Sequence, residues 1–297
     1  MATLKEVKLK IAAVKKTKQI TKAMNMVAAS RLRSAQMRME GFRPYAAKFE
    51  EVLGSLAQSS GDADNPLLVP RAAIKKANIL LCTSDRGLCG GFNANLIDKA
   101  EELAKALTAR GIEVVFTAFG KKGRDFLRRE KLTMVAQHIG VIGGSIGFNI
   151  AATTGREMVT RFLESAYDEV YIVYAEFISL SKQLPVAKQL LPIPPLVLEE
   201  TRVADEETAY LPEHICEPSP EELLGEILPK SVDIQIYRAL LETSASEHGA
   251  RMLAMDNATK ACNDMIGNLT LAYNKARQST ITAELMDIVG GAEALKG

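Results

Sequence analysis

The stretch that decides the fold is residues 230–288, KSVDIQIYRALLETSASEHGARMLAMDNATKACNDMIGNLTLAYNKARQSTITAELMDI. It contains only two glycines, Gly249 and Gly267, and no proline, so little in it would break a helix. Its seam residues recur every three or four positions, with one gap of seven, as in a coiled coil. They are Ile234, Tyr237, Leu241, Ala245, His248, Met252, Met255, Cys262, Met265, Leu269, Ala272 and Ala276. At 1.5 Å per residue this helix would be roughly 90 Å long. We expect Gly290-Gly291 to end it.

The other end of the chain, residues 3–56, has a similar pattern. Its apolar stripe contains Leu4, Val7, Ile11, Val14, Ile20, Met24, Val27, Leu32, Ala35, Met39 and Phe42. We expect Pro44 to bend or locally interrupt this helix. A helix longer than a small domain needs a partner for its apolar stripe, and only these two are of comparable length. We therefore predict an antiparallel coiled coil between an N-terminal helix, residues 1–58, and a C-terminal helix, residues 220–297.

The middle of the chain alternates strand-like and helix-like segments. The strand-like segments are Asn78–Thr83, Ile112–Phe119, Leu132–Ala136 and Val170–Ile178, and the helical ones are Asn93–Arg110, Lys121–Lys131 and Ser145–Tyr167. This alternation is typical of a mostly parallel sheet with right-handed crossovers. We therefore predict an α/β fold in which residues 75–198 form a Rossmann-like domain beside the long coiled coil.

Composition restricts the function. The chain has 297 residues, of which 47% are hydrophobic and 25% charged, and it has no apolar run of the ~20 residues that a membrane span needs. Its four cysteines have neither zinc-site nor disulfide-framework spacing, so no metal site is expected. The net charge of +1 conceals an asymmetry, because residues 1–40 have ten basic and two acidic residues. A basic helix is thus attached to a mildly acidic remainder.

The loop Asp85-Arg86-Gly87-Leu88-Cys89-Gly90-Gly91 follows the first strand, where a phosphate-binding loop would lie. Its glycine spacing matches neither common nucleotide motif, and the second strand ends in Phe119-Gly120 without an acid for a ribose. We favour a structural or contact turn over a nucleotide site. Cys89 would be the candidate nucleophile, but no histidine lies near it in the sequence. His248, on the seam, is interpreted as a packed or partner-contacting residue.

The basic helix fits nucleic acid, an anionic membrane surface or an acidic protein. Nucleic acid is disfavoured because residues 1–40 contain no aromatic side chain for stacking. Small and apolar residues at 24–30 and again at 250–255 cover more than one helical face. This breadth suggests that the helix pair also sits inside another protein, where soft contacts of Met and Ala would permit turning.

Three motifs in order resemble the gamma subunit of F-type ATP synthases across essentially the whole chain. They are residues 20–30, ITKAMNMVAAS; residues 84–91, SDRGLCGG; and residues 273–285, YNKARQSTITAEL. The resemblance implies a rotor shaft that couples proton flow to ATP synthesis or hydrolysis and is itself not an enzyme. Its implied partners are the alpha, beta, epsilon and delta subunits and the membrane c-ring, and no cofactor is implied.

The resemblance also implies contact residues. Arg277 and Gln278 would contact a catch loop of beta, Met24 would lie beside an acidic segment of beta, and Arg251 matches a position tied to coupling. Glu217 would contact the c-ring, although Cys216-Glu217-Pro218 departs from the family's Tyr-Glu-Pro. The chain lacks the cysteine-containing insertion of chloroplast relatives, which favours peripheral attachment to the cytoplasmic face of a bacterial plasma membrane. The alternative is a Rossmann-like nucleotide-binding enzyme with helical dimerisation arms.

Overall fold

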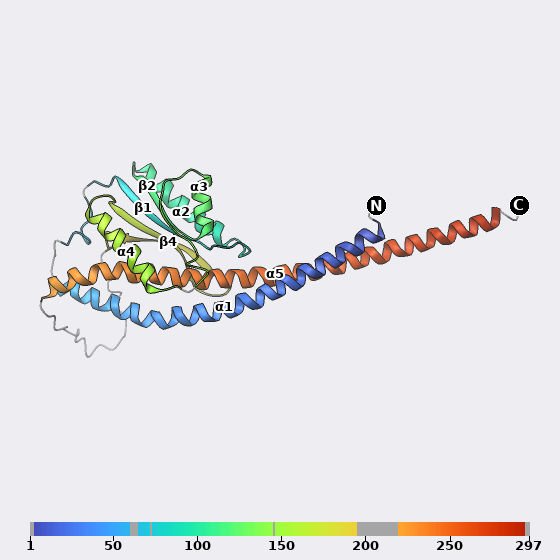
Figure 1. The fold of residues 1–297 in the computed structure, drawn as a ribbon, viewed down its shortest axis with the longest axis horizontal. Coiled ribbons are helices and arrows are strands. Elements are labelled where there is room, and N and C mark those ends of the chain that lie inside the picture. Colours follow the sequence, from blue (N-terminus) through green and yellow to red (C-terminus); the bar gives the residue numbers. More distant parts are fainter. Residues whose placement is uncertain (1–2, 60–64, 72, 145, 195–218, 295–297) are drawn as a thin grey trace, which may run out of the picture. The chain divides into compact units, whose positions relative to one another are not determined.

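The computed structural model describes residues 3–59, 65–71, 73–144, 146–194 and 219–294 (Figure 1). These residues form two compact units. One, which we call the helical unit, consists of the two chain ends, up to residue 29 and from residue 251 onward. The other, the sheet unit, spans residues 30–250.

The sheet unit contains one five-stranded sheet in the order β3-β2-β1-β4-β5. Its strands are β1 (Lys76–Cys82), β2 (Glu113–Phe119), β3 (Met134–His138), β4 (Glu169–Phe177) and β5 (Gln183–Leu191). The first four run parallel, and β5 pairs antiparallel with β4. β1 is completely buried from Ala77 onward, which explains its mostly apolar sequence, and its one buried polar side chain, Asn78, donates to Thr117 Oγ1 at 3.2 Å. The predicted α/β class and the mostly parallel sheet are confirmed, whereas β5 was not anticipated.

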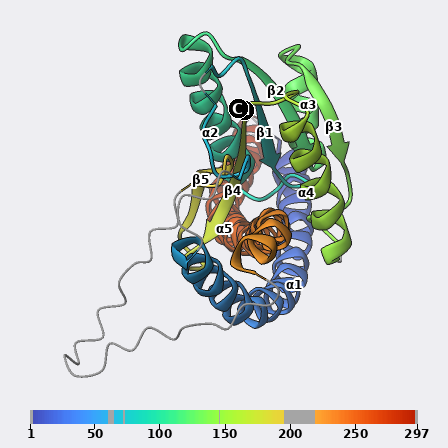
Figure 2. The ribbon, with the colours of Figure 1, turned by 90° about the vertical axis from the view of Figure 1, so that its left-hand side faces the viewer.

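Three shorter helices connect the parallel strands, namely α2 (Phe92–Ala109), α3 (Lys121–Arg129) and α4 (Phe148–Leu163). The crossovers through α2 and α3 move in one direction along the sheet, and the crossover through α4 returns past β1. Right-handed connections then place α4 on the face opposite α2, as Figure 2 shows. This reversal of strand order between β1 and β4 places a potential ligand crevice at the carboxyl ends of the strands.

The two long helices are α1 (Leu4–Ser59) and α5 (Pro220–Ala294). α1 continues through Pro44, so the expected interruption there is absent. α5 continues through Gly290 and Gly291 to Ala294, so the predicted stop is wrong. Glycine permits the left-handed cap that ends many helices but does not impose it.

The long helices are antiparallel within the sheet unit. Phe42 of α1 meets Tyr237 of α5 edge-on, with ring centroids 4.8 Å apart. Ten residues nearer the beginning of α1, the Leu32 side chain lies beside Gly249 of α5, 3.9 Å from where a Cβ would be, so the number falls on α5 as it rises on α1. The predicted antiparallel arrangement therefore holds in this unit.

α5 also completes the sheet beyond the point where β1 stops pairing with β4. The β1–β4 register ends at Leu81 and Val173, which leaves the backbone of Ala175 without a strand partner on that side. Thr243 Oγ1 accepts a hydrogen bond from Ala175 N at 3.4 Å, and Ser246 Oγ donates one to Ala175 O at 3.2 Å. Buried hydroxyls on α5 are thus explained as partners of an orphaned strand end.

Candidate functional site

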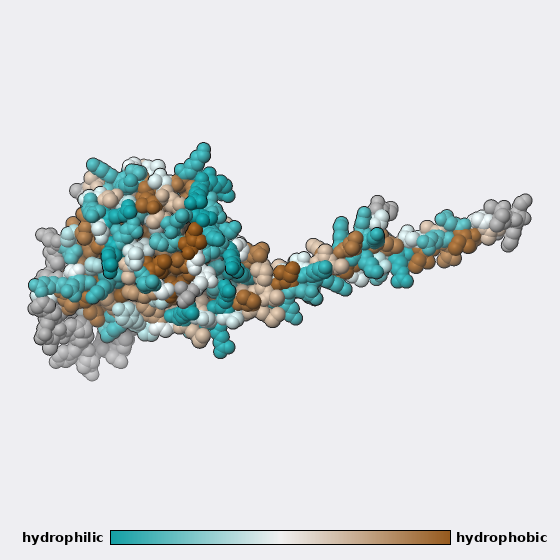
Figure 3. All heavy atoms as spheres, in the orientation of Figure 1, coloured by the Kyte–Doolittle hydropathy of each residue, from teal (hydrophilic) through white to brown (hydrophobic). Residues whose placement is uncertain are grey.

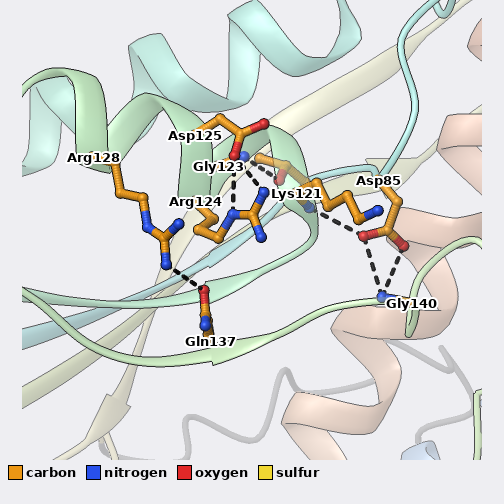
Figure 4. Close-up of polar contacts among 9 residues, drawn as sticks. Asp85, Lys121, Gly123, Arg124, Asp125, Arg128, Gln137 and Gly140 are labelled. Atoms are coloured by element: carbon orange, nitrogen blue, oxygen red, sulfur yellow. Dashed lines mark hydrogen bonds and ion pairs between the residues drawn. The ribbon is translucent and has the colours of Figure 1, made fainter.

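The crevice at the carboxyl ends of the parallel strands is the first candidate site. Its centre is Asp85, whose carboxylate accepts hydrogen bonds from Lys121 N at 3.1 Å and from Gly140 N at 3.1 Å (Figure 4). Lys121 N is the first amide of α3, a position at which a helix N-terminus binds anions. The chain's own carboxylate therefore occupies the position that a phosphate would take.

The rest of the loop is held together by its own side chains. Asn93 accepts a hydrogen bond from Ser84 N at 3.0 Å, and its amide donates to Ser84 Oγ at 2.8 Å and to Cys89 Sγ at 3.2 Å. Cys89 is 2% exposed, which leaves no open approach to its sulfur. These contacts favour the structural turn over the nucleotide site or a nucleophilic cysteine.

No metal centre accompanies this loop. Across the part of the chain that the structure describes, no three His, Cys, Asp or Glu side chains gather in a way that would hold an ion. Nor does any helix within those residues combine the length and apolarity that a bilayer crossing requires.

The helical unit is the second candidate site, and its α1 seam follows a strict seven-residue repeat. The buried and half-buried positions that follow this repeat are Leu4, Val7, Ile11, Val14, Lys18, Thr21, Asn25 and Ala28, and Met24 is half-buried outside it. A 3.5-residue period of this kind is typical of a left-handed supercoil. The prediction placed Ile20 and Val27 on this seam, yet they are 60% and 55% exposed. Choosing the most apolar residues instead of the strict repeat caused that error.

The α5 seam of the same unit has the matching repeat. Its half-buried and buried positions are Met252, Met255, Thr259, Cys262, Ile266, Leu269, Tyr273 and Ala276. The prediction had Met265 and Ala272 in place of Ile266 and Tyr273; both of the former are exposed. Several large apolar residues therefore lie on the outside of the helix pair.

Two polar contacts fix the register between the helices. Thr21 Oγ1 lies 2.8 Å from Thr259 Oγ1, and Asn25 Nδ2 donates to Met252 O at 2.8 Å. As the number rises on α1 it falls on α5, so the pair is antiparallel here too. By this register the first turn of α1 lies near residue 275 of α5.

From about Arg277 to Ala294, α5 continues past the beginning of α1, as the helical unit in Figure 1 shows. Every residue from Arg277 to Ala292 is exposed. The large apolar side chains among them are Ile281, Leu285, Met286, Ile288 and Val289, between 44% and 69% exposed. In Figure 3 the surface of this segment includes hydrophobic residues among polar ones.

The remaining surface of the helical unit is basic and apolar together. On α1 all the lysines except the half-buried Lys18 are exposed, as are Leu9, Ile20, Met26 and Val27. Met26 and Val27 belong to the small and apolar stretch 24–30 that the sequence indicated as a second face, and they depart from the seven-residue repeat of the seam.

The residues expected to contact partners fall as follows. Met24 and Arg251 are half-buried in the helical unit, and Arg277 and Gln278 are exposed where α5 passes the beginning of α1. Glu217 lies outside the described residues. His248 belongs to the sheet unit, where it is 5% exposed.

Comparison with known proteins gives consistent results. A family model described as ATP synthase matches residues 3–295. A protein of Desulfosudis oleivorans named ATP synthase gamma chain is 61% identical over the full length of both chains. Another of that name, from Desulforapulum autotrophicum, is 60% identical over 99% of this chain and 100% of its own. Among solved structures, a chain from the central stalk/c-ring of the Tetrahymena thermophila mitochondrial ATP synthase is 27% identical, with a TM-score of 0.57 over 80% of this chain and 99% of that one.

Proposed function

The chain belongs to the ATP synthase gamma-chain family, and from this premise we propose that it is the central shaft of a rotary ATP synthase. In this role it couples proton flow through a membrane sector to ATP synthesis or hydrolysis on a ring of alpha and beta subunits. Its further partners are the epsilon and delta subunits and the c-ring. The 27%-identical chain in a central stalk/c-ring structure supports the assignment.

The observation that carries the proposal is the unpaired end of α5. Residues 277–292 form a helix whose apolar side chains are exposed and have no partner helix within the described unit. Isolated helices of this length are marginal in water, and exposed apolar patches mark interaction surfaces. A surrounding barrel of other subunits would bury these side chains on all faces at once.

Specific residues would act through differential contact. We propose that Arg277, Gln278, Met24 and Arg251 touch a beta subunit differently at each angle of the shaft. An interaction that is equal in all states shifts no equilibrium, so only such differences drive the beta subunits between conformations. Each exposed ion pair contributes only about 0–1 kcal/mol, so the coupling would be spread over many contacts.

The other assignments follow from the same role. The shaft would catalyse nothing and need no cofactor, and the filled anion position at α3 supports this. Residues 1–58 and 220–297 would be the coiled-coil segments and residues 75–198 the Rossmann-like domain, with Glu217 near the c-ring. The complex would be attached peripherally, through its partners, to the cytoplasmic face of a bacterial plasma membrane.

Substituting Met24→Lys in the assembled complex tests the role of the helical unit. Met24 is half-buried and off the seam, so an added charge would leave the helix pair intact and form a strong ion pair with a carboxylate of beta. We expect ATP-driven proton pumping to fall severalfold more than ATP hydrolysis. Ala23→Lys, on an exposed neighbouring position, is the control and should change both rates little. Unaltered pumping by Met24→Lys would contradict the proposed contact.

Co-purification separates the shaft from the alternative enzyme. A shaft subunit should be recovered with alpha and beta, whereas an enzyme with dimerisation arms should elute as a homodimer without them. A nucleotide-dependent rise in the melting temperature of the chain alone would favour the enzyme.

A further inference from the structure

A cavity with polar and apolar walls lies within the sheet unit, and its Gly143 is close to Asp85 of the strand-end loop. It has a volume of about 270 Å³ and is lined by α1, by the loop between β3 and α4, and by α5. α1 contributes Arg31, Ser34 and Arg38, and α5 contributes Ser244 and His248. Neither the proposed shaft function nor the strand-end loop uses these residues.

The α1 side of the cavity carries two positive charges. Arg31 and Arg38 are two turns apart on one helix, so their guanidinium groups lie on one face with Ser34 between them. Within the described part of the chain neither forms an ion pair; Arg31 donates one hydrogen bond, to Gly143 O at 3.4 Å. Both side chains are exposed and a guanidinium has five N–H donors, so most of their donors are open to a ligand that replaces water.

The α5 side of the cavity is lined by buried polar side chains. Ser244 and His248 are each 5% exposed, and Ser244 Oγ donates to Ile142 O at 3.0 Å, which fixes the loop against the helix. The nearby acid on α5, Glu242, is engaged by Arg238 Nε at 3.1 Å. The cavity therefore combines two arginines that form no ion pair within the described residues with a polar wall held by Ser244.

We propose that this cavity binds a tetrahedral oxyanion of the phosphate class between Arg31 and Arg38. The planar guanidinium matches the edge of a phosphate through paired hydrogen bonds, and such charge-assisted bonds are about twice as strong as neutral ones. A bound phosphate would link α1 to α5 across the cavity and neutralise the two arginines. This proposal does not depend on the proposed shaft function.

Titration of the full-length chain with inorganic phosphate tests the proposal, with binding followed by calorimetry and by the phosphorus NMR signal. We expect saturable binding, and Arg38→Gln or Arg31→Gln should weaken it at least about tenfold, since each removes a charge-assisted contact. Arg33→Gln is the matched control, because Arg33 is exposed on the same helix but does not line the cavity. It should bind phosphate like the parent chain.

Competition with other anions and the electron density of the cavity give two further tests. Sulfate should compete with phosphate, whereas chloride or acetate at equal ionic strength should not. Density for a tetrahedral ion between the two arginines, in a chain prepared in phosphate, would support the proposal independently. Equal effects of acetate and phosphate, or equal losses in Arg33→Gln and Arg38→Gln, would overturn it.

Discussion

At the scale of single residues, Gly120 shows how tightly the strand ends are packed. Its φ is +91°, and a Cβ placed there would lie 2.0 Å from the carbonyl oxygen of Thr83. We expect Gly120→Ala to lower the free energy of unfolding by at least about 3 kcal/mol, because backbone strain and a clash with main chain add together. Urea unfolding of the full-length chain measures this loss.

Gly111→Ala is the matched control. Gly111 also has a positive φ, +80°, but a Cβ there meets nothing within 4 Å. Its substitution should cost only the strain of the left-handed conformation, about 1 kcal/mol. Equal losses at the two glycines would show that the contact with Thr83 contributes nothing.

Asp233 is a residue whose charge opposes folding. Burial raises the pKa of its carboxyl from 3.8 to about 6, against the opposing attraction of Arg156, and Oδ1 has no hydrogen-bond partner. The native state then binds more protons than the unfolded state between those two values. Stability contributed by this group is therefore full below about pH 4 and is lost as the pH rises to about 6.

Asp233→Asn should remove the loss of stability that the ionised carboxylate causes at higher pH. Because the side chain is partly solvated, we expect a gain of about 1–2 kcal/mol in unfolding free energy at pH 8 and roughly half as much at pH 5. Urea unfolding at both pH values measures the difference. Asp264→Asn, at an exposed position on the same helix, should give no such pH-dependent gain. A larger gain at pH 5 than at pH 8 would contradict the assignment.

At the scale of elements, the helical unit is held by a seam that is partly polar. Thr21 and Thr259 face each other at 2.8 Å, and their hydroxyls also approach Lys18 O at 3.0 Å and Met255 O at 2.8 Å. Two hydroxyl protons serve three contacts, so one contact is always unmade. Replacing both hydroxyls by methyl groups of the same shape is expected to stabilise the pair by about 1 kcal/mol.

The double variant Thr21→Val/Thr259→Val tests this expectation. Amide hydrogen exchange in α1 around residue 21 should slow about fivefold, since protection follows local opening energy. Thr270→Val is the control, because the Thr270 hydroxyl bonds only Ile266 O of its own helix and is exposed. Faster exchange in the double variant would mean that the hydroxyl pair is itself stabilising.

The helices and strands whose sequences have a clear hydrophobic period could be predicted. Those that form only because of contacts with distant parts of the chain could not. The four parallel strands and both long helices followed from pattern alone. β5, QLPVAKQLL, contains a proline and two charged or amide side chains between apolar ones, and it is a strand because β4 offers it an edge. The seam was misplaced where Lys18, Thr21 and Asn25 occupy core positions, because residue hydrophobicity then conflicts with the seven-residue period.

The candidate site was also only partly predictable from the sequence. The loop at residues 85–91 was identified from its position after β1, but nothing in the sequence indicates that Asp85 would turn back to the head of α3. That contact depends on the register between β1, β2 and β3, which brings Gly120 and Gly140 beside it. The cavity of Arg31 and Arg38 was equally hidden, since its walls come from three distant segments.

At the scale of the whole molecule, the two units place different demands on their surroundings. The sheet unit has a buried apolar core and satisfies its strand ends with side chains from α5, although some of its large apolar side chains, such as Met37 and Leu88, are exposed. The helical unit leaves large apolar side chains exposed on both helices. The end of α5 in the helical unit, which has no partner helix among the described residues, therefore requires partners to complete its burial.

Hydrogen exchange can detect those partners directly. In the isolated full-length chain, amides of residues 279–292 should exchange rapidly, because a helix without tertiary packing opens with little cost. In the complex with alpha and beta subunits, burial of Ile281, Leu285 and Ile288 should slow that exchange at least about a hundredfold. Amides of α2, which is already packed on the sheet, should be equally protected in both samples. If residues 279–292 stayed unprotected in the complex, the end of α5 would lie outside the ring and the shaft assignment would fail, since nothing would then hold the rotating helix in place.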